Sequence, residues 1–368
     1  MKIFFNEVQL KAIQYKKEIE KKVSEIVDSG IFLHGKENET LVKNLNKYLG
    51  KGNAVITHSG TDALHLAIKS LKLSDKDEVI FPVNTYPTAF PLAISKVKLV
   101  PVDVDENGLI NPKEITKKLA KKTKAIIVVH LYGLVVNLDE IKKTIKNRGI
   151  FLIEDCAQAF GSLYKKKPVG TFADISCFSF YPTKNLATLG DGGAIWTNNK
   201  KLYNHFKKII SYGEKKRYFS QFIAEHSRLP EIQAGVLNIY FKNINIELES
   251  RKKVIKWYQE LIKKYKVDKF LRILYHNKSS DPVVHLLVIE AKKRNQLKAF
   301  LNSKKIPTGI HYPRSIHLLP AFSYLGYKKG DFPMAEHLSE KILSLPFHSY
   351  LTLAQIDYIV KSIRDFYE

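Results

Sequence analysis

The chain has 368 residues, of which 45% are apolar and 11% aromatic, a composition typical of globular proteins that argues against a disordered one. Its length predicts one large domain and a smaller one. The formal net charge of +24 raises the question of a nucleic-acid partner. However, the lysines are spread along the whole chain, arginine is scarce, and neither a zinc-finger spacing nor a basic-region heptad pattern occurs. We therefore expect a solvated lysine surface and no nucleic-acid partner.

The first 26 residues predict an amphipathic helix and lack the apolar core and small-residue cleavage site of a signal peptide. The longest apolar stretch, AIIVVHLYGLVV, is too short to span a membrane and is interrupted by His130 and Gly133. Cys156 and Cys177 both lie in apolar runs, which favours buried thiols over a disulfide and suits a reducing compartment. These features predict a soluble cytoplasmic protein that does not contact membranes.

Short β-branched runs then alternate with helical patterns up to about residue 245. The runs that predict strands are NAVITH, EVIFP, KLVPVDV, KAIIVVHLYG, GIFLIEDCA, ISCFSFY and GGAIWTN. Alternation of this kind is typical of an α/β fold with a mainly parallel sheet covered by helices. After residue 245 the pattern changes to long charged helices and a few short strands. We therefore predict a large domain at 1–245 and a small C-terminal α/β domain at 246–368.

The first segment that indicates chemistry is THSGTDALHLAI, a strand followed by a helix that opens at Gly60 and Thr61. A glycine lets backbone N–H groups approach a ligand closely, and a helix N-terminus favours an anion, so this segment fits a phosphate. An ordinary capped helix start explains it equally well. Neither GxxxxGK nor GxGxxG occurs, which argues against the commonest nucleotide-binding motifs.

The strand GIFLIEDCAQAFGS is apolar until it ends at Glu154 and Asp155, with Gln158 three residues later. A carboxylate at the end of a buried strand requires a cation or hydrogen-bond donors. A protonated pyridine nitrogen is such a cation, and pyridoxal phosphate (PLP) enzymes use this pairing to keep the ring able to accept electrons. The alternative is that Asp155 caps a helix at CAQAF.

Lys184 follows the strand DISCFSFY and Pro182, so its amine should emerge near the other strand ends. A lysine there can form a Schiff base with an aldehyde, which divides amino-group transfer into two easier half-reactions. Ser179, five residues earlier, is placed to bond a phosphate. Tyr86, in VNTYPTAF, is placed to stack on a pyridine ring.

These blocks resemble the DegT/DnrJ/StrS family of PLP-dependent sugar-nucleotide aminotransferases. The resemblance runs nearly end to end through HSGTDALHLAI, VNTYPTAF, VVHLYG, EDCAQAFGS, SFYPTKNLATLGDGGAIWTNN, SRLPEIQAGVL and GIHYPRSIHL. It implies fold type I, the aspartate aminotransferase-like architecture: a large three-layer α/β/α domain with a mainly parallel sheet and a smaller C-terminal domain. It also implies that Lys184 binds PLP and that Asp155 faces the pyridinium nitrogen. The other cofactor contacts it implies are Gln158 at the phenolic oxygen, Gly60, Thr61 and Ser179 at the phosphate, and Tyr86 on the ring.

The resemblance also indicates the substrate and the assembly. It implies a nucleotide-linked keto sugar as acceptor, L-glutamate as amino donor, and a homodimer whose active sites are shared between chains. Tyr181, His311 and Tyr312 would lie near the sugar, and Arg228 would reach the partner's substrate. His226 stands where the family usually has an asparagine that contacts the partner's cofactor phosphate; an imidazole can still donate that hydrogen bond.

The pattern FYPTKNL…LGDGG resembles members that act on 3-keto sugars, which predicts a dTDP-3-keto-6-deoxyhexose as acceptor and a dTDP-3-amino-3,6-dideoxyhexose as product. Alternatives are a 4-keto or UDP-linked sugar, a PLP-dependent sugar dehydratase, or a non-catalytic regulatory relative. Dehydratases of the family carry histidine in place of Lys184, and a non-catalytic relative would not need to keep Lys184, Asp155 and Gln158 together. His130 is interpreted as a core histidine. No metal site is predicted, since His285, His317 and His348 show no ligand spacing with an acid.

Overall fold

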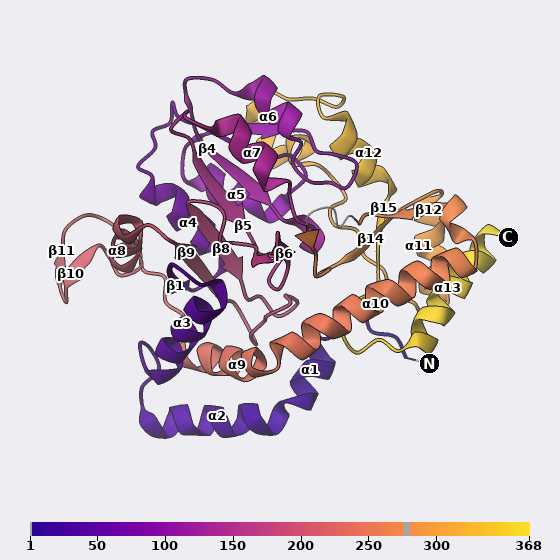
Figure 1. Cartoon of the computed structure of the whole chain (residues 1–368), viewed down its shortest axis with the longest axis horizontal. Helices are drawn as coiled ribbons and strands as arrows, with labels where there is room; N and C mark the ends of the chain where they lie inside the picture. Colours follow the sequence, from indigo (N-terminus) through magenta and orange to yellow (C-terminus); the bar gives the residue numbers. More distant parts are fainter. Residues whose placement is uncertain (1, 276–279) are drawn as a thin grey trace.

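The computed structural model describes residues 2–275 and 280–368. A seven-stranded sheet lies at the centre of its larger part, in the strand order β1-β9-β8-β5-β4-β2-β3 (Figure 1). The strands are β1 (Asn53–Thr57), β2 (Glu78–Pro82), β3 (Lys98–Val102), β4 (Thr123–Val129), β5 (Phe151–Asp155), β8 (Ile175–Ser179) and β9 (Gly193–Thr197). In this sheet only β9 runs opposite to the rest, because it pairs antiparallel with both β1 and β8. The mainly parallel α/β sheet is confirmed.

The central strand β2 is buried along its whole length and β4 at all positions but Lys124, which explains their nearly continuous apolar sequences. Because β1, β5 and β8 run in the same direction, their carboxyl ends meet at one edge of the sheet. Asp155 is the last residue of β5 and Ser179 the last residue of β8. Open α/β sheets bind ligands outside this edge, so the fold brings the predicted site residues together.

Helices surround the central sheet. They are α3 (Lys36–Leu49), α4 (Gly60–Ser70), α5 (Tyr86–Ile94), α6 (Pro112–Lys118), α7 (Leu138–Ile145), α8 (Lys200–Ile209) and α9 (Glu231–Lys242). Of these, α4 packs against β8 and β9, α8 against β1, and α6 against β3. The N-terminal segment, predicted as one helix, forms two helices, α1 (Val8–Gln14) and α2 (Lys16–Ser29), which meet at the buried Tyr15. Tyr15 leaves the regular helical conformation and ends the first helix.

The long helix α10 (Ile244–Lys264) leads from the larger part into the smaller one (Figure 1). The smaller part holds an antiparallel sheet in the order β12-β14-β15, and α13 packs on α10 and α11. The elements are β12 (Leu271–Ile273), β14 (Leu287–Ala291), β15 (Ile342–Leu345), α11 (Arg294–Ser303) and α13 (Leu353–Tyr367). A separate apolar core fills this part, and it includes Ile3 from the beginning of the chain. The segment before α1, which includes Ile3 and Phe5, is held there because Phe347 N donates to Phe5 O at 3.2 Å.

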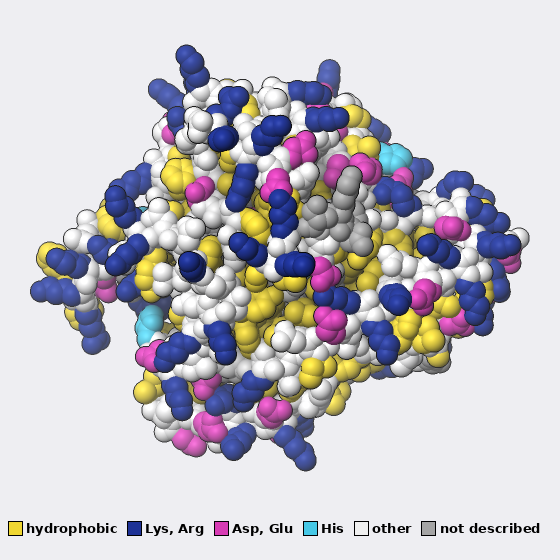
Figure 2. Space-filling model, viewed as in Figure 1, with side chains coloured by type: hydrophobic (Ala, Val, Ile, Leu, Met, Phe, Trp, Pro, Cys, Tyr) yellow, Lys and Arg dark blue, Asp and Glu magenta, His cyan; other side chains and the backbone are white. Residues whose placement is uncertain are grey.

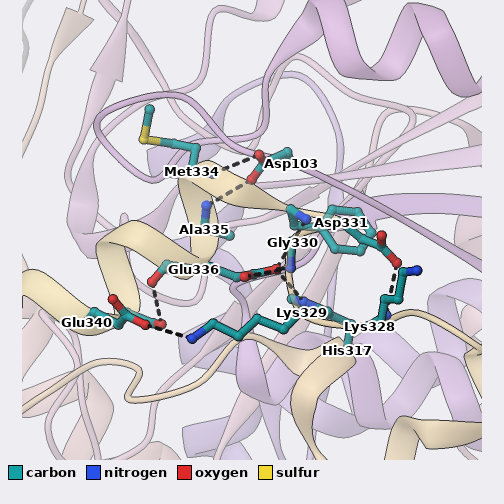
Figure 3. Close-up of polar contacts among 12 residues, drawn as sticks. Asp103, His317, Lys328, Lys329, Gly330, Asp331, Met334, Ala335, Glu336 and Glu340 are labelled. Atoms are coloured by element: carbon teal, nitrogen blue, oxygen red, sulfur yellow. Dashed lines mark hydrogen bonds and ion pairs between the residues drawn. The ribbon is translucent and has the colours of Figure 1, made fainter.

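Two acidic residues hold helix α12 (Pro333–Lys341): the half-buried Asp103 of the larger part and the buried Glu336 of the helix itself (Figure 3). Asp103, just after β3, accepts hydrogen bonds from Met334 N at 3.0 Å and Ala335 N at 2.9 Å and so caps the helix. Glu336 accepts from Gly330 N at 2.9 Å and lies 2.9 Å from the buried His317 Nε2. The contacts of Glu336 therefore join α12 to the segment before it at His317 and Gly330.

The remaining short elements lie outside these two sheets. They are β6 (Leu163–Tyr164), β7 (Lys167–Pro168) and β13 (Ser280–Asp281), which form a small sheet, the hairpin β10 (Glu214–Lys216) and β11 (Phe219–Ser220), and the 3-10 helices η1 (Leu131–Gly133), η2 (Val267–Lys269), η3 (Ile316–Leu318) and η4 (Pro320–Leu325). Both cysteines are buried and unbonded, as predicted. Lysine and arginine side chains are scattered over the visible face without forming one patch (Figure 2). Among the described helices, none is long and apolar enough to cross a membrane.

Candidate active site

A cavity of about 350 Å³ lies at the carboxyl edge of the central sheet, with walls from both parts of the molecule. The predicted residues that line it are Gly60, Thr61, Asp155, Gln158, Ser179, Tyr181, Lys184, His311 and Tyr312. Tyr86, His226 and Arg228 do not line it. Tyr86 begins α5 beside the cavity, with its ring centroid 5.8 Å from that of Tyr312 and 44% of the residue exposed. Its stacking on the cofactor ring remains a prediction.

Lys184 is the only lysine among the described residues that line the cavity. It lies in the loop after β8, where its backbone N–H donates to Tyr181 O at 2.8 Å. Burial lowers the pKa of its amine to about 8, and attraction to Asp155 partly offsets that effect. A larger fraction of this amine is therefore neutral near physiological pH than at a surface lysine, and the neutral amine is the nucleophile.

Asp155 is 4% exposed, and both of its carboxylate oxygens accept hydrogen bonds. Oδ1 accepts from Ala157 N at 3.1 Å, and Oδ2 accepts from the Thr88 hydroxyl at 2.9 Å. The segment after Asp155 forms turns rather than a helix, so the helix-cap alternative is wrong. Burial raises the pKa of Asp155, although these two donors and Lys184 oppose that rise. A cationic ring nitrogen placed against Asp155 would compensate the cost of burying its charge.

The N-terminus of α4 approaches the end of β8 closely. A Cβ added to Gly60 would lie 2.6 Å from Ser179 Cβ, which no side chain tolerates. The helix begins here and is capped by Ser59, whose hydroxyl accepts from Asp62 N at 3.0 Å. The capped-helix reading is therefore correct, yet the same geometry places the first helical N–H groups and the Thr61 hydroxyl at the cavity. This end of the cavity suits a phosphate.

Gln158 is oriented by the loop after β4. Its Oε1 accepts from Tyr132 N at 2.7 Å, which leaves Nε2 as a donor toward the cavity, 3.4 Å from the Tyr312 hydroxyl. Burial raises the pKa of Tyr312 to about 12, so this phenol stays protonated. His311, beside it, lies with Nδ1 2.8 Å from Ser344 Oγ, and burial and Lys184 lower its pKa. The GIHYP segment thus presents uncharged polar groups near Lys184.

His130 is a core histidine, as predicted. It is fully buried, with Nε2 3.0 Å from Glu154 and Nδ1 accepting from Val136 N at 3.2 Å. Burial raises the pKa of Glu154, but hydrogen bonds from His130 and from backbone N–H groups, including that of Gly170, outweigh it and lower the pKa. With Cys156 these two residues form the one cluster of metal-ligand type found among the described residues. Both imidazole nitrogens are already hydrogen-bonded, so the cluster has a structural explanation.

The residues present fit PLP. The cavity offers a phosphate-suited helix start, an acid for a ring nitrogen, an amide donor at Gln158 and a lysine of lowered pKa. When bound, PLP accepts the electrons released on the substrate carbon and carries the amino group between substrates. Lys184 would hold the cofactor and carry a proton to and from the substrate carbon, and Asp155 would keep the ring nitrogen protonated.

Residues 14–364 match the model of the DegT/DnrJ/EryC1/StrS aminotransferase family. The chain belongs to this family. The pleiotropic regulatory protein of Geobacillus stearothermophilus is 36% identical over 361 residues, covering 96% of this chain and 95% of that protein. The dTDP-3-amino-3,6-dideoxy-alpha-D-galactopyranose transaminase of Aneurinibacillus thermoaerophilus is 34% identical, with 96% of each chain covered.

A solved structure of DesV from Streptomyces venezuelae superposes with a TM-score of 0.95 at 29% identity, covering 100% of this chain and 99% of that one. The aspartate aminotransferase-like fold is thereby confirmed, and with it PLP as cofactor. This DegT/DnrJ/EryC1/StrS member is a PLP-dependent sugar-nucleotide aminotransferase. Lysine, rather than the histidine of the family's dehydratases, stands at position 184.

One residue that contacts Asp155 was not predicted from the sequence. Thr88 lies in the first turn of α5, is 2% exposed, and bonds Asp155 across 67 positions of sequence. Its position in VNTYPTAF, two residues after Tyr86, is the only local signal. Because Thr88 donates to the carboxylate that would face the ring nitrogen, we interpret it as a positioning residue.

We expect a Thr88→Val variant to lose roughly tenfold in turnover, since hydrogen bonds to charged groups contribute about 1.5–3 kcal/mol. The Thr88 bond lowers the pKa of Asp155, so its loss should raise that pKa. The carboxylate form is then lost at a higher pH, and the acid limb of the pH–rate profile should move upward. Thr88→Ser keeps the hydroxyl and should keep the profile; an unshifted limb in Thr88→Val would contradict the assignment.

Proposed function

We propose that this aminotransferase moves the amino group of L-glutamate to a dTDP-3-keto-6-deoxyhexose, which yields a dTDP-3-amino-3,6-dideoxyhexose. The observation that carries the proposal is the cavity in which Lys184 and Asp155 meet beside the uncharged polar groups of His311 and Tyr312. Uncharged donors and acceptors suit sugar hydroxyl groups. The FYPTKNL…LGDGG pattern and the dTDP-3-amino sugar relative support the 3-keto position.

We propose further that the enzyme is a homodimer with shared active sites. Arg228 lies outside its own cavity, with its guanidinium 5.5 Å from the Tyr212 ring centroid, and the ring of His226 lies 5.1 Å from the same tyrosine. Phe32 O accepts from Glu231 N at 2.9 Å, so the exposed apolar segment 31–33 lies near Arg228. Exposed apolar side chains beside an arginine are typical of a protein interface. In the dimer, Arg228 and His226 would serve the partner's substrate and cofactor phosphate.

Product NMR tests the proposal directly. The PLP enzyme should convert a dTDP-3-keto-6-deoxyhexose in the presence of L-glutamate, with nitrogen appearing on carbon 3 of the hexose. Parallel reactions with 4-keto and UDP-linked sugars serve as comparisons. Nitrogen on carbon 4 would contradict the 3-keto assignment. Faster turnover of UDP-linked sugars than of dTDP-linked ones would contradict the assignment of dTDP as the nucleotide. Turnover of keto acids alone would contradict a sugar substrate.

A further inference from the structure

The segment Val283–His285 leads into the cavity wall, which His285 and Leu286 line, and it is hydrogen-bonded to the loop that carries Lys184. The backbone of Val283 is held by two hydrogen bonds. Its N–H donates to Ser162 Oγ at 2.8 Å. Val283 O accepts from Asn185 Nδ2 at 3.3 Å. Asn185 directly follows Lys184, so one side chain connects this segment to the residue after the catalytic lysine.

The backbones of Val284 and His285 are also held by hydrogen bonds. Val284 O accepts from the buried Arg251 Nη1 at 3.1 Å. His285 N donates to Tyr132 O at 2.8 Å, and the N–H of the same Tyr132 orients Gln158. The backbone around His285 is therefore preorganised against two residues of the predicted cofactor site.

The His285 ring reaches the cavity through one nitrogen. The residue lines the cavity and is 5% exposed. Its Nδ1 is fully enclosed and has no hydrogen-bond partner within the described chain. Nε2 makes no hydrogen bond with the described residues and is not among the enclosed unpartnered atoms. Because His285 lines the cavity, we infer that Nε2 is the ring nitrogen that faces it. A polar atom held in this way, on a rigid backbone, is available to a ligand.

The charge of the ring indicates which ligand group it suits. Burial, together with the positive charges of Lys184 and Arg251, lowers the pKa of His285 well below its ordinary value. An imidazole that stays neutral offers little attraction to the carboxylates of an amino donor or to a diphosphate. It can exchange a hydrogen bond with a hydroxyl group as donor or acceptor.

We propose that His285 binds a hydroxyl group of the hexose ring through Nε2 and thereby helps to select the sugar. This inference rests on the proposed sugar-nucleotide substrate and adds a residue that no sequence pattern assigned to the site. In this proposal His285 contacts the sugar, and Asn185 and Arg251 help to position His285 by fixing the backbone of Val283 and Val284.

Calorimetry on the PLP enzyme with stable ligands tests the inference without turnover. The probes are dTDP and dTDP-glucose, with UDP and UDP-glucose as a second pair; only one member of each pair carries a hexose. His285→Leu should weaken binding of the hexose-bearing ligand about tenfold and leave the free diphosphate unchanged. His285→Gln, which retains a polar group, should restore part of the affinity. His205→Leu, a histidine outside the cavity, is the matched control and should match the wild type.

Equal weakening of both members of a pair, or no weakening, would overturn the role of His285. Slower reaction of His285→Leu with L-glutamate in a single half-reaction would assign the residue to the donor instead and equally overturn it. A wild-type enzyme that binds neither pair would refute the sugar-nucleotide substrate itself. Circular dichroism of the variants separates these outcomes from misfolding, since the hydrogen bonds of this segment are made by its backbone.

Discussion

A Lys184→Ala variant should fold and lose transamination completely. Alanine can neither bind the aldehyde of PLP nor carry the proton at the substrate carbon, so both half-reactions lose their essential amine. No other lysine of the described chain lines the cavity to replace it. The expected loss is therefore larger than for any other single substitution in this site.

The assay for this prediction is product formation together with borohydride reduction and peptide mapping of the wild-type enzyme. Reduction should attach the cofactor to Lys184 alone. Lys200→Ala, which changes an exposed lysine at the start of α8, is the control and should behave as the wild type. Cofactor attached to another lysine, or measurable turnover by Lys184→Ala, would refute the assignment.

An Asp155→Asn variant should fold and still bind PLP through Lys184, but turnover should fall by roughly a hundredfold or more, as for other loss of catalytic electrostatics. A neutral amide cannot keep the ring nitrogen protonated, so the ring becomes a poor electron acceptor. The amide oxygen can still accept from Ala157 N, and the amide N–H can donate to the Thr88 hydroxyl oxygen, so the turn after β5 should survive.

Steady-state turnover and the thermal midpoint of unfolding measure the two halves of this prediction. Asp139→Asn is the matched control, because Asp139 is an exposed acid that pairs with Lys165 at the surface. Near-normal turnover by a stable Asp155→Asn enzyme would mean that Asp155 only orders the local turn.

Much of the fold follows from local sequence pattern. Each run predicted as a strand of the main sheet forms one, because continuous β-branched runs bounded by turn residues have few alternatives. Because Asp155, Ser179 and Lys184 lie at or just after the ends of predicted strands, the sequence also predicted that they would meet, and all three line the cavity. The break at Tyr15 was missed, because amphipathic periodicity continues through it.

Other parts of the site depend on contacts between distant residues, which the local sequence pattern does not predict. Thr88 meets Asp155 across 67 positions, and Asn185 meets Val283 across 98. A threonine and an asparagine in isolation fit many roles, so sequence alone could not select them. From the sequence, His285 was considered only as a metal ligand. Its position in the cavity wall depends on the folding of the small part against the large one, so only the structure shows it. The roles of Tyr86, His226 and Arg228 stay predictions.

The packing of Ile3 in the C-terminal core has a consequence for how the protein is made. Ile3 is synthesised long before its core partners from the C-terminal helix, such as Val360 and Ile363. The buried pair of Glu7 with Arg251 also joins distant parts of the chain, 244 positions apart. The central sheet can begin to assemble during synthesis, but the core of the small part and one wall of the cavity are completed only after these later residues have been made. Until then Ile3 lacks part of the core that covers it, so the apolar segment around it would be exposed to chaperones.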